Sequence, residues 1–154
     1  VPKTGIAGTC DIGDLKDIHP VNKQEVGRRL ALWALAKDYG KTDLVFSGPM
    51  YDSISVEGNK IRVKFKYSEG GLISRDNQPL TWFLVAGEDK NFVKANAGID
   101  GNDILVDAAG IDKPAAVRFG WHQFAEPNLA NKAGLPAIPF RSDSWDDAQV
   151  PTEQ

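Results

Sequence analysis

A histidine and a carboxylate stand two residues apart near the start of the chain, in the stretch Asp17-Ile18-His19-Pro20. An imidazole beside a carboxylate is the pair that acyl transfer needs, because the imidazole takes a proton from a nucleophile and the carboxylate fixes its tautomer. Asp17 is the first candidate for the orienting carboxylate and Asp14 the second, with backbone carbonyls as a third alternative. The structural alternative for His19 is a loop histidine that caps or packs against the start of a helix.

Cys10 is the only cysteine, so the chain has no internal disulfide and no multi-cysteine metal site. A thiolate nucleophile paired with His19 is one reading of Cys10. A cysteine at the end of a buried strand is more often a small, inert core residue, and we expect that role here. We expect no cofactor and no metal.

The elements that must position His19 are a strand and a helix. Residues 4–12 are rich in small and β-branched types and lead into Gly13 and Asp14, which predicts one buried strand followed by a loop over residues 13–20. In α/β sheets the connection between a strand and the next helix lies at the carboxyl edge of the sheet, where catalytic groups gather. This position favours His19 over His122, the other histidine, as the catalytic candidate.

The helix is predicted over residues 23–39, with Asn22 as N-cap, Glu25 as its capping-box partner and Gly40 as the left-handed C-terminal residue. Apolar residues follow at helical spacing and should form the buried face: Val26, Leu30, Trp33 and Ala34. The rest of the helix surface should be polar and should carry Arg28, Arg29 and Lys37.

After the helix the pattern changes to a period of two, and Ile61, Val63 and Phe65 alternate with charged residues. Further short runs of this type cover residues 53–57, 80–86, 92–97, 103–107 and 115–121, and turn pairs such as Glu57-Gly58, Gly70-Gly71 and Asp100-Gly101 separate several of them. These signals predict an antiparallel β-sandwich. Residues 123–154 contain several prolines and are expected to be an ordered coil that becomes a loose tail after Trp145.

The sequence thus predicts an α+β protein that is mainly β, divided into residues 1–42 and residues 43–154, with the boundary within residues 41–50. A single strand has no partner in its own segment. We therefore expect the first part to be the terminal strand and helix of a larger α/β sheet, and the second to be an accessory β-sandwich.

Composition excludes some partners. The 154 residues carry a net charge of −3 and no basic stripe, so we expect no nucleic-acid partner. No apolar run approaches the length that spans a bilayer, so we expect no membrane partner. We expect a secreted or periplasmic location, although a single cysteine leaves the redox compartment open.

The segment around His19 resembles a known motif block. Residues 11–32, DIGDLKDIHPVNKQEVGRRLAL, are similar to the last block of the GDSL/SGNH hydrolases in the form found in bacterial sialate O-acetylesterases. The likeness continues through SGPMY (47–51), VEGNKIRV (56–63), VAGEDKNFV (85–93) and GLPAIPFRSD (134–143), and it extends from about Gly8 to Trp145. The chain therefore resembles the C-terminal portion of that family.

This resemblance implies the removal of an acetyl group from a sugar through an acyl-enzyme on serine, with His19 as general base and then general acid. Many SGNH enzymes have the aspartate three residues before the histidine, where this chain has Lys16, so Asp17 takes that role by default. The chain contains no Gly-Asp-Ser nucleophile motif, no Gly-x-Ser-x-Gly elbow and none of the family's oxyanion-hole blocks. We expect it to be inactive without a serine-bearing N-terminal part of the same enzyme.

The aromatic residues allow a second interpretation. Trp33 belongs to the predicted helix face, whereas Trp82, Trp121 and Trp145 fill a sandwich core or stack on a sugar ring. Arg141 forms a surface ion pair with Asp143 or Asp146, or binds the carboxylate of an acidic sugar.

Two functions follow. The first is the catalytic-histidine part of a serine carbohydrate esterase acting on sialic acid or a related acetylated sugar such as xylan. The alternative is a non-catalytic β-sandwich that binds carbohydrate or has a structural role.

Overall fold

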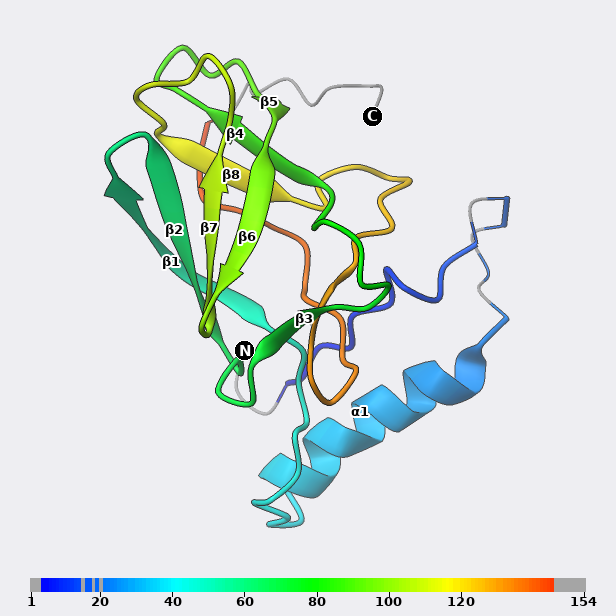
Figure 1. Cartoon of the computed structure of the whole chain (residues 1–154). Helices are drawn as coiled ribbons and strands as arrows, with labels where there is room; N and C mark the ends of the chain where they lie inside the picture. Colours follow the sequence, from blue (N-terminus) through cyan, green and yellow to red (C-terminus); the bar gives the residue numbers. More distant parts are fainter. Residues whose placement is uncertain (1–3, 15, 18, 20, 146–154) are drawn as a thin grey trace.

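The computed structural model describes residues 4–14, 16, 17, 19 and 21–145, and within them the protein is mainly β with one helix (Figure 1). The helix is α1 (Lys23–Lys37). The strands are β1 (Met50–Glu57), β2 (Lys60–Lys66), β3 (Leu72–Ser74), β4 (Phe83–Ala86), β5 (Val93–Lys94), β6 (Asn96–Asp100), β7 (Asp103–Asp107), β8 (Ala116–Phe119), β9 (Leu129–Asn131) and β10 (Phe140–Arg141). The described α1 is not a helix that could cross a membrane. We refer to residues 50–141, which hold all ten strands, as the β region.

Helix α1 begins where the sequence predicts. The Asn22 side chain accepts a hydrogen bond from the Glu25 backbone N–H at 3.1 Å, which satisfies one of the unpaired amides of the first turn. Gly40 has a φ of +67° just after the helix, as expected for a left-handed terminating residue. The capping-box prediction for the Glu25 side chain is wrong, because its carboxylate accepts hydrogen bonds from Arg28 and Arg29 instead. Charge-assisted hydrogen bonds to guanidinium groups are stronger than one to a neutral amide.

The predicted buried face of the helix is only partly correct. Val26 and Trp33 are partly buried, but Leu30 is half-exposed, and the most buried residue of the helix is Arg29. The face that contacts the rest of the protein is therefore centred on an ion pair. Trp33 contacts the rings of Phe46 and Tyr67 edge to face, at 4.8 and 5.9 Å between centroids.

The predicted strand over residues 4–12 is not formed. Residues 4–9 have no regular secondary structure, and a turn follows in which the Ile12 N–H donates to the Thr9 carbonyl at 3.1 Å. A strand requires a neighbour that exchanges backbone hydrogen bonds with it, and none of the ten described strands pairs with this segment. A composition rich in β-forming residues is therefore not enough by itself to make this segment a strand.

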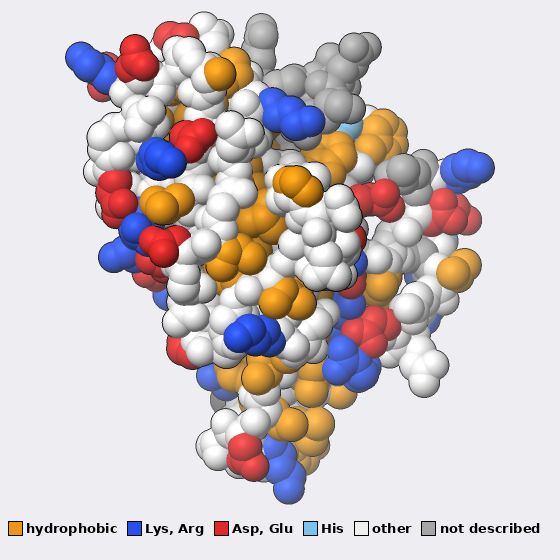
Figure 2. All heavy atoms as spheres, in the orientation of Figure 1, with side chains coloured by type: hydrophobic (Ala, Val, Ile, Leu, Met, Phe, Trp, Pro, Cys, Tyr) orange, Lys and Arg blue, Asp and Glu red, His pale blue; other side chains and the backbone are white. Residues whose placement is uncertain are grey.

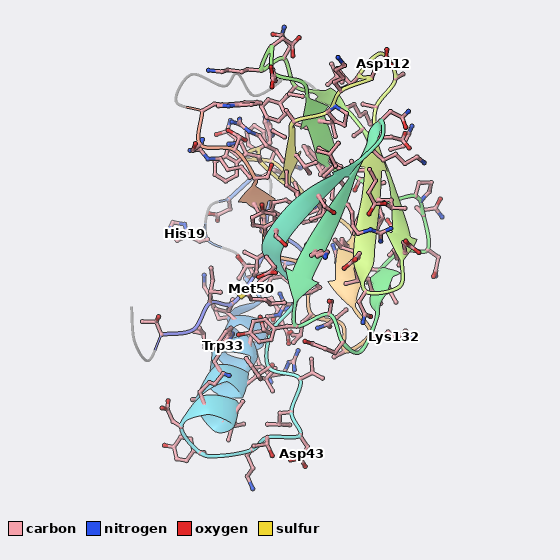
Figure 3. The ribbon with its side chains drawn as sticks, turned by 90° about the vertical axis from the view of Figure 1, so that its left-hand side faces the viewer. His19, Trp33, Asp43, Met50, Asp112 and Lys132 are labelled. Carbon is pink, nitrogen blue, oxygen red and sulfur yellow. The ribbon has the colours of Figure 1, made fainter. Side chains whose placement is uncertain are left out.

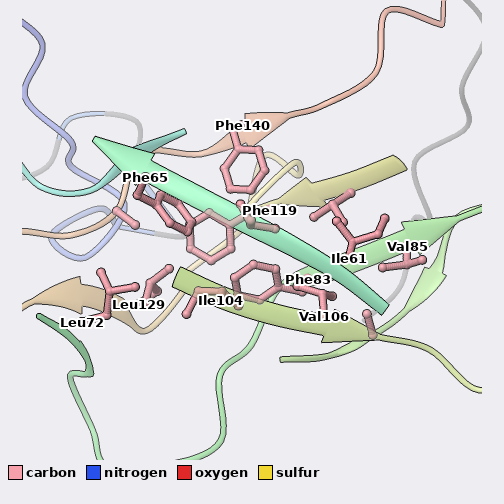
Figure 4. Packing of buried hydrophobic residues seen from close by; sticks show 14 of the residues in the cluster. Ile61, Phe65, Leu72, Phe83, Val85, Ile104, Val106, Phe119, Leu129 and Phe140 are labelled. Atoms are coloured by element: carbon pink, nitrogen blue, oxygen red, sulfur yellow. The ribbon is translucent and has the colours of Figure 1, made fainter. Parts of the chain in front are cut away.

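Two four-stranded antiparallel sheets make up most of the β region, in the orders β1-β2-β7-β6 and β10-β8-β4-β5. The hairpins β1–β2 and β6–β7 turn at Gly58 and Gly101, both with a φ of +65°, as the turn pairs predict. Alternate residues of β2 are buried, and they meet residues of β4, β7, β8 and β10 in one apolar core (Figure 4). The buried side chains that both sheets contribute include Ile61, Val63, Ile104, Val106, Phe83, Val85, Val117, Phe119 and Phe140.

The expectation of coil after residue 123 is wrong for two segments. Strand β9 pairs with β3, which the sequence also did not indicate, and β10 pairs with β8. Both strands are three residues or shorter and lie close to prolines, so they carry too little alternating pattern to be recognised. The expected tail after Trp145 lies outside the described residues. The predicted boundary within residues 41–50 falls in the segment that connects α1 to β1 and stays a prediction.

Candidate active site

The segment that carries His19 is joined to the helix by a buried ion pair. Arg29 donates to both carboxylate oxygens of Asp11, at 2.6 and 2.7 Å, and also to the Gly8 carbonyl at 2.5 Å. The side chains of Arg29 and Asp11 are only 6% and 8% exposed. Glu25 accepts from the Arg29 Nε at 2.8 Å, and hydrogen bonds to Asp11 raise the pKa of Arg29 further above its usual range. The segment before His19 is therefore fixed to the middle of α1.

The sequence did not predict this ion pair. Glu25 and Arg29 stand four residues apart on one helix, which is a recognisable spacing for a charge pair. Asp11 lies 18 residues from Arg29, and no local pattern connects them. Arg75, between β3 and β4, has its Nη1 3.9 Å from Asp11, so the β region also faces this charge.

Asp17 and His19 are in contact. The Nδ1 atom of His19 lies 3.0 Å from Oδ1 of Asp17, and the His19 backbone N–H donates to the same oxygen at 2.8 Å. A carboxylate oxygen accepts only, so in the neutral imidazole Nδ1 carries the proton and Nε2 is free to act as a base. Within the described residues, the hydrogen bonds of His19 all involve Asp17.

Asp14, the second candidate, is engaged elsewhere. Its carboxylate accepts a hydrogen bond from the Lys16 backbone N–H at 2.8 Å. The contact to the histidine therefore comes from the first of the three alternatives. The catalytic roles of His19 and Asp17 stay predictions.

The pair lies open to solvent. The side chains of His19 and Asp17 are 77% and 59% exposed, and Figure 3 shows His19 at the edge of the molecule. The hydrogen bonds from the backbone and side chain of His19 hold the pKa of Asp17 below its usual range. Asp17 therefore stays ionised at neutral and mildly acidic pH, the condition for orienting the imidazole.

Cys10 has the properties of an unreactive thiol. Its Sγ lies 3.7 Å from the Ala137 carbonyl oxygen, to which the thiol donates. Burial, together with the nearby charge of Asp11, raises the pKa of Cys10 to about 11. The thiolate is the reactive form, so a nucleophilic role at neutral pH is disfavoured.

We expect Cys10 to react slowly with an aromatic disulfide reagent at pH 8. From the raised pKa and an unfolded-state value of about 8.5, modification of the native protein should be at least ~100-fold slower than in concentrated urea. The measurement is the rate of thiol release in both conditions at one pH. Equal rates would show that the thiol is neither buried nor protonated.

The three tryptophans that follow α1 in the sequence have different surroundings. Trp82 is partly buried and stacks on His122, at 5.9 Å between centroids and 19° between planes. Trp145 packs on Phe92, at 5.9 Å, against the outer face of the sheet that contains β4 and β8. Trp121 is exposed and does not belong to either buried cluster.

Asp143 is bound mainly by a residue that sequence analysis did not single out. Arg118 on β8 donates to both its carboxylate oxygens, at 2.7 and 2.8 Å, and each of the two side chains is only 1% exposed. Burial alone would raise the pKa of Asp143, but the hydrogen bonds from Arg118 hold it below its usual range. Arg141 lies 3.9 Å from the same carboxylate, a weaker contact. The sequence signal that could have indicated this buried ion pair is the single arginine within the apolar strand Ala116–Phe119.

The described residues contain no group of three or more histidine, cysteine, aspartate or glutamate side chains placed to hold a metal ion. The chemistry that the described site offers is proton transfer at an oriented imidazole, with the nucleophile supplied from elsewhere.

Comparison with known proteins gives an informative match among solved structures. No family model matches the chain, and no curated protein sequence matches it. Among solved structures, the chain is similar to a carbohydrate acetylesterase from Xanthomonas citri, with 41% sequence identity and a TM-score of 0.84. The match covers 88% of this chain but 31% of that enzyme, so the chain spans about a third of its length.

The similarity supports a relationship to carbohydrate esterases, as the resemblance around His19 predicts. The narrower prediction of a sialate O-acetylesterase stays a prediction.

Proposed function

We propose that this chain is the histidine-bearing, C-terminal part of a serine carbohydrate esterase that removes O-acetyl groups from sialic acid or a related acetylated sugar. The observation that carries the proposal is the 3.0 Å contact between Asp17 and His19, in a chain similar to part of a carbohydrate acetylesterase. In this proposal residues 1–42 end an SGNH hydrolase domain, and residues 43–154 are its accessory β-sandwich with a coil tail.

His19 acts in both halves of the reaction. Its Nε2 takes the proton of a serine hydroxyl as the serine oxygen attacks the acetyl carbonyl, and Asp17 stabilises the imidazolium that forms. The imidazolium then donates this proton to the sugar oxygen as the ester bond breaks. A water molecule, deprotonated by His19, releases acetate and regenerates the serine.

The exposed apolar surface of α1 supports the proposal that another part of the enzyme covers this helix. Leu30, Trp33 and Ala34 line a groove of about 460 Å³ together with Thr4 and Gly5. Leu30 and the nearby Ile6 are both half-exposed. Apolar side chains gathered in this way mark surfaces that another protein segment covers. The partner we propose is the N-terminal, serine-bearing part of the same enzyme.

The exposure of His19 supports the same partner. Its charge interaction with Asp17 is screened by water in this chain, whereas proton transfer and charge stabilisation are most effective in a site from which water is excluded. Covering the pair with the N-terminal part would supply this exclusion together with the nucleophile.

The proposal is tested by measuring acetate release with this chain alone and with the serine-bearing part added. We expect no release by the chain alone and clear turnover after the addition. Turnover by the chain alone, or none by the two parts together, contradicts the proposal. Assaying 9-O-acetylated sialic acid beside acetylated xylo-oligosaccharides decides between sialate and other sugars.

A further inference from the structure

The loop between β8 and β9 presents two large aromatic side chains to solvent. Trp121 is 39% exposed and Phe124 is 50% exposed, with the partly buried His122 between them. We call residues 121–125 the aromatic loop. Figure 2 shows apolar side chains beside a histidine at the upper right of the molecule, where this loop projects in Figure 1. Exposed aromatic residues grouped in one loop are typical of recognition surfaces.

The backbone that holds the aromatic loop is in an unfavourable conformation. Trp82, just before β4, has a φ of +66°, in the left-handed region that bulky side chains rarely occupy. Its carbonyl accepts a hydrogen bond from the Gly120 N–H at 2.9 Å, and Gly120 itself has a φ of +58°. Such backbone strain at a non-glycine residue is concentrated at functional sites. Here it places the Trp82 ring under His122.

Two of the three rings of the loop, those of His122 and Phe124, pack against each other. His122 stacks on Trp82 and lies 5.6 Å from the Phe124 ring. The Phe124 N–H donates to Nδ1 of His122 at 3.2 Å, so this nitrogen is the acceptor and Nε2 carries the proton. The loop therefore combines flat apolar faces with a hydrogen-bond donor and needs little ordering to bind a rigid ligand.

Arginine side chains lie beside Trp121. The guanidinium carbons of Arg141 and Arg118 are 5.6 and 5.9 Å from the centre of its ring. Arg118 is buried and bound to Asp143, whereas Arg141 is about one-third exposed and donates to the Trp145 carbonyl at 3.4 Å. The Arg141 guanidinium therefore lies over the Trp121 ring and brings hydrogen-bond donors to this exposed aromatic side chain.

We propose that the aromatic loop is a carbohydrate-binding platform, on which a pyranose ring stacks against Trp121 while its hydroxyl groups accept hydrogen bonds from Arg141. A pyranose has an apolar face of C–H groups and a rim of hydroxyls, which suits an exposed aromatic ring that has guanidinium donors beside it. The loop and the described part of residues 9–22 project on the same side of the molecule in Figure 1. A sugar bound on the loop therefore lies on the proposed catalytic side of the molecule, an arrangement that rests on the proposed function.

The test is calorimetric titration of the full chain with two probes, xylohexaose and 3′-sialyllactose, beside intrinsic tryptophan fluorescence. We expect saturable binding of at least one probe, weakened about tenfold or more by Trp121→Ala. Trp121→Phe, which keeps an aromatic face, should retain part of the affinity. Tyr39→Ala is the matched control, because Tyr39 is an exposed aromatic residue at the other end of α1 from His19, and it should bind as the unchanged protein does.

Absence of binding of both probes, or equal affinity of the Trp121→Ala and unchanged proteins, overturns the proposal. If Trp121→Ala fails to fold, as judged by its thermal transition, Phe124→Ala replaces it with the same expected loss. The titration uses no ester and no serine-bearing part. Sugar binding and acetate release therefore succeed or fail separately, and each result is assigned to its own proposal.

Discussion

Replacing His19 with alanine should lower kcat/KM for acetyl-ester hydrolysis by about 10³- to 10⁴-fold in an enzyme that contains both this chain and the serine-bearing part. The variant lacks the base that takes the serine proton and returns it to the leaving sugar oxygen. The measurement is initial-rate kinetics of acetate release, with the thermal transition recorded to show that the variant is folded. The side chain is exposed in this chain, so we expect that transition to be unchanged.

Two neighbouring carboxylates provide the matched pair for this experiment. Asp17→Asn should cause a smaller loss than His19→Ala, because the imidazole stays in place as the base and loses only the carboxylate that contacts Nδ1 at 3.0 Å. Asp14→Asn should leave turnover unchanged, since Asp14 is bound to the Lys16 amide. Unchanged kinetics in His19→Ala would refute the catalytic assignment, and equal losses in the two aspartate variants would refute the role of Asp17.

Replacing Arg29 with methionine should lower the free energy of unfolding by about 3–5 kcal/mol, because it leaves the Asp11 carboxylate buried without its bidentate partner. The remaining cation, Arg75, is 3.9 Å away and does not replace two hydrogen bonds of 2.6 and 2.7 Å. The measurement is urea denaturation followed by circular dichroism. Hydrogen exchange should show that the loss of amide protection is concentrated in α1 and in the segment before His19.

Arg28 is the control for this prediction. It is the next residue along the helix and binds the same Glu25, but its side chain is half-exposed. Arg28→Met should therefore cost no more than about 0.5 kcal/mol. A double variant, Arg29→Met with Asp11→Leu, should recover much of the stability, since an apolar pair removes the buried charge. Equal stability of the Arg28→Met and Arg29→Met variants would show that the buried pair does not hold the helix.

Acid should weaken the contacts of Glu25 with Arg28 and Arg29 within a defined pH range. Hydrogen bonds from Arg28 and Arg29 lower the pKa of Glu25 to about 2. A carboxylate whose pKa is depressed by folding contributes stability that is fully present above its unfolded value of about 4.3. The contribution of Glu25 is then lost progressively as the pH falls from there toward 2, and the urea titration repeated at low pH measures it.

Local patterns in the sequence determined the parts of this protein whose partners are close in the chain. The start of α1 follows from Asn22, whose side chain accepts from the backbone N–H three residues later, and the hairpin β1–β2 follows from alternating residues around Gly58. The contact between Asp17 and His19 is of the same kind, because a two-residue separation keeps the side chains within reach. These features depend on backbone preferences and hydrogen bonds that a short segment satisfies by itself.

Only the tertiary structure decided the features that depend on distant partners. Residues 4–9 have the composition of a strand but no neighbouring strand, and β9 has a weak pattern but a partner in β3. Asp11 meets Arg29 across 18 residues, and Arg118 meets Asp143 across 25. A buried charge is stable only when its partner is brought to it by the fold, and a strand only when a neighbour completes its hydrogen bonds. The sequence by itself thus determined the helix, the hairpins and the Asp17–His19 pair, while chain folding decided what anchors that pair and which aromatic residues stay exposed.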